Sequence, residues 1–265
     1  MREFLGLSVK ANGKMGFLRT PEGAWSWQHI LQASIFMIVM TVLAIIIGKK
    51  YKNKSDTEKN KVLIISAILI DAFELLKIII LCIRYQDPFH WRYSLPLFLC
   101  SIQLIAIPLA AFSKGRIKEA CLDFVLIFGL MGAVFGTVGA ANIYSKNPVF
   151  AMDPINSAIT HSISGFASLY IAISGMVSMK KENFIITLSI LLGFSIIAFV
   201  MNKVVGYNYM FLEFHDGTPY SIFYNFVNGN QVLYPLIVVT IFVVYVSLFY
   251  FIYHKIKDKK ALKNQ

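Results

Sequence analysis

The apolar residues of this chain fall into long blocks separated by short polar stretches. The blocks lie at about 30–48, 62–84, 94–113, 120–140, 157–178, 184–204 and 232–254. Most have about 20 residues, the length that a helix needs to cross roughly 30 Å of hydrocarbon. The pattern predicts an all-α fold, a polytopic membrane bundle of about seven transmembrane helices within residues 29–255. A segment outside the cytoplasm, 1–28, precedes the bundle, and a basic cytoplasmic tail, 256–265, follows it.

Basic residues predict the orientation of this bundle. The connections 49–61, 114–119 and 180–181 and the tail carry roughly twice as many Lys and Arg residues as the opposite side. Because cytoplasmic loops are enriched in these residues, we expect the N-terminus outside and the C-terminus inside a multi-pass protein of the cell (plasma) membrane. The formal net charge of +11 therefore indicates contact with anionic lipid headgroups, and we expect no nucleic acid partner.

Composition supports a membrane protein. The chain of 265 residues is 57% hydrophobic and has a mean hydropathy of +0.64, which leaves too little polar surface to cover a soluble domain. Its three cysteines form no CxxC pair, and their odd number argues against a disulfide framework. We expect no metal and no cofactor.

The second apolar block contains three charged residues, Asp71, Glu74 and Lys77. A charge at this depth costs several kcal/mol unless it is paired or hydrated, so each is a candidate functional residue. The spacing of three residues allows Glu74 to pair with either neighbour on the helix surface. A structural cluster that neutralises itself is the alternative interpretation.

The third block places Pro96, Cys100 and Gln103 on one face of a predicted helix. Cys100 is a candidate nucleophile if a neighbouring base activates its thiol. A cysteine in an apolar helix is otherwise inert packing, which is our interpretation of Cys82 and Cys121.

The fifth block begins with a small, polar stripe that contains His161, Ser164, Gly165 and Ser168. A histidine in hydrocarbon is expected to face the bundle interior, where it is either a general base or a packing residue. On the predicted topology Cys100 lies roughly 9 Å and His161 roughly 6 Å below the same membrane surface. His29 and Asn202 lie on this side as well.

The fourth block contains Gly132 and Gly136 in a GxxxG arrangement. Such a pair presents a flat surface for another helix. We therefore expect close helix packing here, with a homo-oligomer as a possible consequence.

Four motifs carry a resemblance to a known family: W-S-W-Q-H at 25–29, L-P-L-F-L-C at 95–100, the T-H-S around His161, and N-K-V-V-G-Y-N-Y-M-F-L at 202–212. In their order and spacing the chain resembles the bacterial YwaF-type integral membrane proteins, which are similar to the transmembrane protein 164 acyltransferases. The resemblance covers about residues 25–250. One departure is Phe98, where many relatives have a histidine, and this puts catalysis by the present chain in question.

The resemblance implies acyl transfer between phospholipids or lysophospholipids through a thioester. Cys100 matches the nucleophile and His161 the base. On the same basis Asn202 or Asn208 would stabilise the oxyanion, with Gln103 and His29 as supporting residues. Lys77, Arg84 and Arg92 would hold a lipid phosphate. A related threonine-type group of membrane hydrolases suggests water as a second possible acceptor.

Two other functions remain open from the residues alone. In a transporter component, Asp71, Glu74 and Lys77 would form an ion-coupling or substrate site near mid-membrane. In a non-catalytic scaffold, Gly132 and Gly136 would matter for assembly, and Cys100 and His161 would tolerate substitution.

Overall fold

A computed structural model describes residues 1–263, and the chain is mostly helical. The α-helices are α1 (Trp27–Tyr51), α2 (Asp56–Tyr85), α3 (Gln103–Phe112), α4 (Gly115–Thr137), α5 (Ala141–Lys146), α6 (Met152–Ser174), α7 (Phe184–Val205), α8 (Ser221–Phe226) and α9 (Leu233–Lys263). Three short 3-10 turns, η1 (His90–Tyr93), η2 (Lys181–Asn183) and η3 (Tyr209–Phe211), lie between them. Near the N-terminus, β1 (Ser8–Val9) and β2 (Met15–Gly16) pair as a small antiparallel hairpin.

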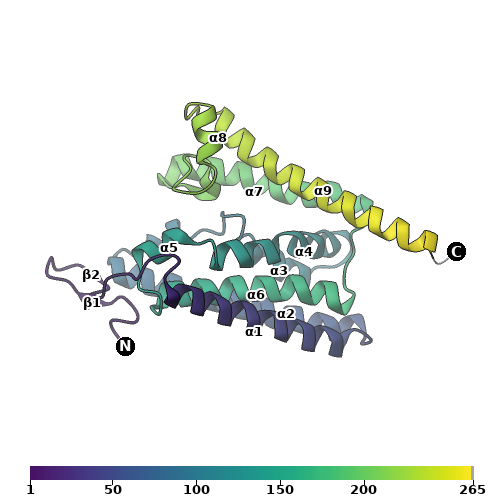
Figure 1. The fold of residues 1–265 in the computed structure, drawn as a ribbon, viewed down its shortest axis with the longest axis horizontal. Coiled ribbons are helices and arrows are strands. Elements are labelled where there is room, and N and C mark those ends of the chain that lie inside the picture. Colours follow the sequence, from purple (N-terminus) through teal and green to yellow (C-terminus); the bar gives the residue numbers. More distant parts are fainter. Residues whose placement is uncertain (264–265) are drawn as a thin grey trace.

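The long helices form two groups that run side by side (Figure 1). One group contains α1, α2, α3, α4 and α6, and the other contains α7 and α9 with α8 at one end. Helix α6 packs against α1, α2 and α4. Small residues permit this close packing: a Cβ added at Gly165 of α6 would lie 2.3 Å from the sulfur of Met40 and 2.6 Å from Ala133.

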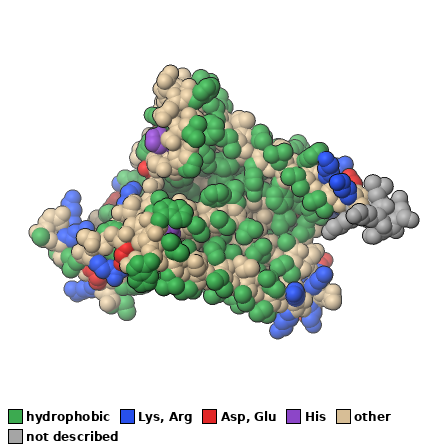
Figure 2. Space-filling view, viewed as in Figure 1, with side chains coloured by type: hydrophobic (Ala, Val, Ile, Leu, Met, Phe, Trp, Pro, Cys, Tyr) green, Lys and Arg blue, Asp and Glu red, His purple; other side chains and the backbone are tan. Residues whose placement is uncertain are grey.

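Four helical segments are long and apolar enough to cross a membrane: Trp27–Tyr51, Gly115–Lys146, Lys181–Val205 and Leu233–Lys259. Their outward faces carry apolar side chains such as Ile38 and Ile196, which are 62% and 65% exposed. In the face drawn in Figure 2, the Lys and Arg side chains gather toward the two ends of the molecule, and hydrophobic side chains dominate between them. A solvent-exposed apolar band between two charged ends is typical of a multi-pass membrane protein.

The prediction of seven spans goes beyond these four segments, and the third predicted span is not one continuous helix. Residues 94–102 are irregular, and α3 has only 10 residues, which measure about 15 Å and cannot cross the bilayer alone. Pro96 disfavours a helical conformation at the preceding residue. The Ser101 hydroxyl also accepts a hydrogen bond from the Phe98 backbone N–H at 2.9 Å, so a side chain replaces helical hydrogen bonding.

Helix boundaries differ from prediction at both ends of the chain. Helix α9 continues past the predicted last span and through the basic tail to Lys263, because the sequence there contains no helix-breaking residue. Asn264 and Gln265, the end of the predicted tail, lie outside the described residues. The predicted first segment is folded: the carboxylate of Glu3 accepts hydrogen bonds from the backbone N–H groups of Leu18 and Arg19.

A buried ion pair joins this N-terminal segment to two helices. The guanidinium of Arg84, near the end of α2, donates to both carboxylate oxygens of Asp153 in the first turn of α6, at 2.5 and 2.9 Å. It also donates to the backbone carbonyl of Leu5 at 2.6 Å and lies over the ring of Phe17. Arg84 is only 5% exposed, so this bidentate pair fixes α2, α6 and the N-terminal segment together.

We expect Asp153→Asn to destabilise the fold by about 3 kcal/mol, because it removes the counter-charge of a buried guanidinium. Thermal unfolding in detergent should show a fall of several degrees in Tm. Lys54→Gln is the matched control: Lys54 pairs with Glu58 at 3.7 Å but is half exposed, so its loss should change Tm little. Equal effects of the two substitutions would contradict a structural role for the Arg84–Asp153 pair.

Candidate active site

A cavity of about 340 Å³ lies at the end of the bundle where α2 ends and α6 begins. Its walls come from α2, η1, the irregular segment before α3, α5, α6 and the residues after α7. The polar side chains that line it include Glu74, Lys77, Cys100, Ser157 and His161. The structure therefore brings the candidate nucleophile and the candidate base into one cavity.

Cys100 and His161 both line this cavity, and each lies against α4, Cys100 at Gly132 and His161 at Gly136. The Nδ1 of His161 lies 2.7 Å from the backbone carbonyl oxygen of Ser157. A carbonyl can only accept, so Nδ1 carries the proton and donates it. Nε2 is then the ring nitrogen with a free lone pair, which is the state that a general base needs to take a thiol proton.

Helix α4 makes room for this pair with glycines. A Cβ added at Gly136 would lie 2.0 Å from Cδ2 and 2.1 Å from Nε2 of His161. A Cβ added at Gly132 would lie 3.3 Å from the Cβ of Cys100. Within the chain, both glycines thus pack against the candidate catalytic pair. The predicted homo-oligomer through these glycines stays a prediction.

Cys100 lies just before the first turn of α3, in the irregular segment. Among the backbone hydrogen bonds of residues 1–263, none uses the N–H groups of Leu99 or Cys100. Gln103, three residues further on, is fully buried, and neither polar atom of its amide has a hydrogen-bond partner within the described chain. An unpaired backbone N–H at the thiol-bearing residue is suited to stabilising negative charge on an oxygen, whereas Gln103 does not line the cavity.

The charged residues predicted on α2 separate. Lys77 and Glu74 line the cavity and form an ion pair of 2.5 Å. Asp71 lies on the exposed side of α2, outside the cavity, and has no ion pair among the described residues. Glu74 and Lys77 follow the cavity-facing Ile70 by four and seven residues and so share its face of the helix, whereas Asp71 is the residue next to Ile70 and lies on another face. The predicted three-residue cluster is therefore a pair.

The two arginines predicted to hold phosphate are occupied elsewhere. Arg84 is engaged by Asp153 and Leu5 and does not line the cavity. Arg92 pairs with Asp87 at 3.3 Å and lies over the ring of Tyr93, half exposed. Lys77 is the one predicted phosphate ligand that lines the cavity.

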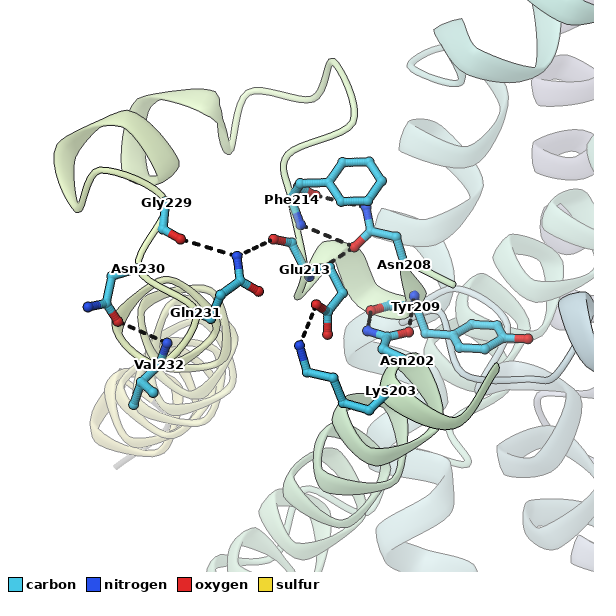
Figure 3. Close-up of polar contacts among 10 residues, drawn as sticks. All are labelled: Asn202, Lys203, Asn208, Tyr209, Glu213, Phe214, Gly229, Asn230, Gln231 and Val232. Atoms are coloured by element: carbon cyan, nitrogen blue, oxygen red, sulfur yellow. Dashed lines mark hydrogen bonds and ion pairs between the residues drawn. The ribbon is translucent and has the colours of Figure 1, made fainter. Parts of the chain in front are cut away.

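Three of the predicted supporting residues bind backbone groups away from the cavity. The side chain of Asn202 accepts from the Tyr209 backbone N–H at 2.6 Å and donates to its carbonyl at 3.0 Å (Figure 3). Asn208 holds the following turn through Glu213 and Phe214 (Figure 3). Both amides are therefore used in structure and are not available as oxyanion donors.

His29 is likewise satisfied in the core. Its Nδ1 accepts from the Trp25 backbone N–H at 2.9 Å, so Nε2 donates to the carbonyl of Thr137 at 3.0 Å. Its ring lies 3.8 Å from that of Tyr144, between centroids. His29 is 1% exposed and does not line the cavity, so it anchors α1 to α4 and α5.

Tyr209 is a positioning residue that our sequence analysis did not single out, although it lies in the motif 202–212. Asn202 holds its backbone on both sides, and its hydroxyl donates to the carbonyl of Arg92 and accepts from the Leu95 N–H. Its ring contacts Phe98, with 5.5 Å between centroids. The segment that carries Cys100 is thereby fixed by a residue more than 100 positions away in the chain.

Residues 24–253 match the sequence profile of the TMEM164 family. The chain belongs to the TMEM164 family. The match covers most of the chain and includes all four motifs and every residue that lines the cavity. No curated protein matches it, and no solved structure matches it.

In this TMEM164-family chain, aromatic residues border the cavity next to the thiol. Phe98 contacts the rings of Tyr207, Tyr209 and Phe211. His90 lines the cavity between helices α2 and α3, and partial burial lowers its pKa below the usual value, against the opposing effect of Asp87. These residues give no periodic signal in the sequence, because they lie in turns and an irregular segment.

We expect Gly136→Ala to displace the imidazole of His161, because the added methyl group would overlap the ring. Overpacking of this kind costs about 1–3 kcal/mol and should lower Tm in detergent. Gly193→Ala is the control: Gly193 lies within α7 with nothing within 4 Å of an added Cβ, so alanine should raise stability by up to about 1 kcal/mol. A Gly136→Ala protein as stable as Gly193→Ala would show that the ring is not held against α4.

Proposed function

We propose that this protein is a membrane-embedded, thiol-dependent phospholipid acyltransferase, with acyl hydrolysis as its variant when water is the acceptor. The observation that carries the proposal is that Cys100 and His161 line the same cavity, packed one helical turn apart against α4, at one end of an apolar bundle. A nucleophile, a base and a group that orients the base are the three parts that covalent acyl transfer requires. Here the Ser157 carbonyl is the orienting group.

In the first half-reaction, the thiol of Cys100 transfers its proton to Nε2 of His161, and the sulfur attacks the ester carbonyl of a phospholipid. The tetrahedral intermediate breaks its C–O bond, and His161 returns the proton to the departing hydroxyl of the lysophospholipid. A thioester on Cys100 remains. In the second half-reaction, His161 takes the proton of an acceptor hydroxyl, whose oxygen attacks the thioester, and the proton then restores the thiol.

The negative oxygen of each tetrahedral intermediate needs donors close to the sulfur. The backbone N–H of Cys100 meets this need better than Asn202 or Asn208, because no backbone carbonyl uses it, whereas the two asparagine amides already bind backbone groups. Gln103 is buried without a partner but does not line the cavity. An oxyanion donor contributes about 3–4 kcal/mol to the transition state. In the same proposal Lys77 binds the lipid phosphate without Arg84 and Arg92, which do not line the cavity.

In this proposal the reaction takes place in the outer leaflet of the plasma membrane, on the orientation that the basic connections predict. The proposal retains seven membrane-crossing or membrane-embedded segments: the four long apolar segments, together with α2, α6 and the short α3 with its irregular leader. Several polar residues of α2 and α6, among them Glu74, Lys77 and His161, line the cavity. This is the expected behaviour of functional residues in a bilayer.

A transporter component is the second class that the sequence left open. Its predicted site required Asp71, Glu74 and Lys77 together, and Asp71 lies outside the cavity that holds the other two. A non-catalytic scaffold would use α4 glycines for assembly, whereas these glycines contact Cys100 and His161 within the chain. The position of Asp71 and the contacts of the α4 glycines therefore both support the enzyme over the transporter and the scaffold.

We expect Cys100→Ala to abolish acyl exchange, and His161→Ala to slow it by about 10²–10⁴-fold, because the thiol then lacks its base. The measurement is transfer of a labelled acyl chain to lysophospholipid in proteoliposomes. A hydroxylamine-sensitive label on the wild-type protein should report the thioester, and Cys100→Ala should lack it.

The matched control is Cys82→Ala, since the Cys82 thiol lies outside the cavity and donates only to the Pro88 carbonyl. This variant should exchange acyl chains at the wild-type rate. Normal exchange by a folded Cys100→Ala protein would end the acyltransferase proposal. Release of free fatty acid without transfer would assign the hydrolase variant.

A further inference from the structure

A second cavity, of about 550 Å³, lies at the opposite end of the bundle. It lies between the start of α7 and the last turns of α9, and its walls are Lys181, Phe184, Ser247, Tyr250, Phe251, His254, Lys255 and Asp258. The 22 residues of α7 separate it from Tyr207 in the candidate active site, a distance of roughly 33 Å. The two cavities are therefore independent sites.

Basic groups dominate the polar lining of this cavity. Lys181 and Lys255 are exposed and form no ion pair within the described part of the chain, whereas the adjacent Lys180 is held by Glu119 at 2.5 Å. His254 contributes a ring whose buried Nε2 has no hydrogen-bond partner among the described residues. Asp258 is the one acidic residue in the lining. The lining therefore carries excess positive charge and an unused polar atom.

A buried carboxylate behind this cavity ties the start of α7 to α9. Asp123 of α4 is fully buried and accepts hydrogen bonds from the Met179 N–H at 2.7 Å, the Asn183 amide at 3.3 Å and the Tyr250 hydroxyl at 2.8 Å. Its charge is thus satisfied by three donors from the connection before α7 and from α9. This network fixes the two sides of the cavity at a defined separation.

The remaining wall is apolar and continues onto the outer surface of the helices. Phe184 and Phe251 line the cavity, and the ammonium of Lys255 lies 5.6 Å from the ring centroid of Phe251. Ile185, Leu248 and Phe251 are exposed by half or more next to it. Cations thus lie directly beside a lipid-facing apolar surface, which suits a molecule with a phosphate at one end and hydrocarbon at the other.

We propose that this cavity binds the phosphate headgroup of an anionic phospholipid, with Lys181 and Lys255 as the phosphate ligands and the acyl chains along Phe184 and Phe251. Basic pockets between membrane helices bind such headgroups in other membrane proteins. A free phosphate ion would use the same cations but gain nothing from the apolar wall. The site does not depend on the acyltransferase proposal.

The test measures lipid retention by the full-length protein in detergent, by native mass spectrometry. The probes are phosphatidylglycerol, phosphatidylcholine and inorganic phosphate, each at a series of concentrations. We expect the wild-type protein to retain phosphatidylglycerol at least tenfold better than phosphatidylcholine. We expect the double variant Lys181→Gln, Lys255→Gln to lose this preference.

A second double variant, Lys257→Gln, Lys259→Gln, is the control. These two lysines lie on α9, like Lys255, but outside the cavity. It removes equal charge and should retain the wild-type preference. Equal losses in the two variants would overturn the proposal and indicate general attraction to basic residues. Displacement of the lipid by millimolar inorganic phosphate would also overturn it, in favour of a soluble anion. Because both lysine pairs are exposed, both double variants should unfold at the wild-type temperature in the absence of lipid. A lower unfolding temperature of either variant would reveal a folding defect.

Discussion

The close approach of α4 to α6 is the constraint on which the rest of this structure depends. A Cβ at Gly129 would lie 2.6 Å from the Ser164 carbonyl, and one at Gly136 would overlap the imidazole of His161. In a bilayer there is little hydrophobic force between helices, so van der Waals packing over small residues has to hold them together. The same missing side chains that let the backbones approach also leave the space that His161 occupies. The glycines of α4 therefore serve both the packing of the two helices and the placement of His161.

The candidate site is held in place by segments that are distant in the sequence. Arg84 and Asp153 join the end of α2 to the start of α6, close to His161 along the same helix. Asn202 holds Tyr209, and Tyr209 holds the backbone from Arg92 to Leu95 ahead of Cys100. These ties involve buried polar groups, whose loss is costly because an unpaired partner remains. The irregular segment that carries Cys100 needs such ties, since it has few helical hydrogen bonds of its own.

Two polar cavities lie at opposite ends of an otherwise apolar bundle, and they differ in kind. The first combines a thiol, an imidazole and an ion pair and is suited to bond making and breaking. The second combines unpaired cations with aromatic walls and is suited to binding without chemistry. A bilayer presents ester bonds and phosphates at about the level where its apolar core ends.

The amino-acid sequence by itself determined that the chain is mostly helical, where its long apolar stretches lie, and that the protein belongs in a membrane. These properties depend on the free energy of placing each segment in hydrocarbon, which is a sum over local residues. The tertiary structure alone decided that residues 94–102 are irregular, that Asp71 faces outward while Glu74 faces the cavity, and that Asn202, Asn208 and His29 bind backbone. It also showed that Gly132 and Gly136 contact the candidate pair. Which side chains meet depends on the order and rotation of the helices, and these are set by packing between segments that hydropathy treats separately.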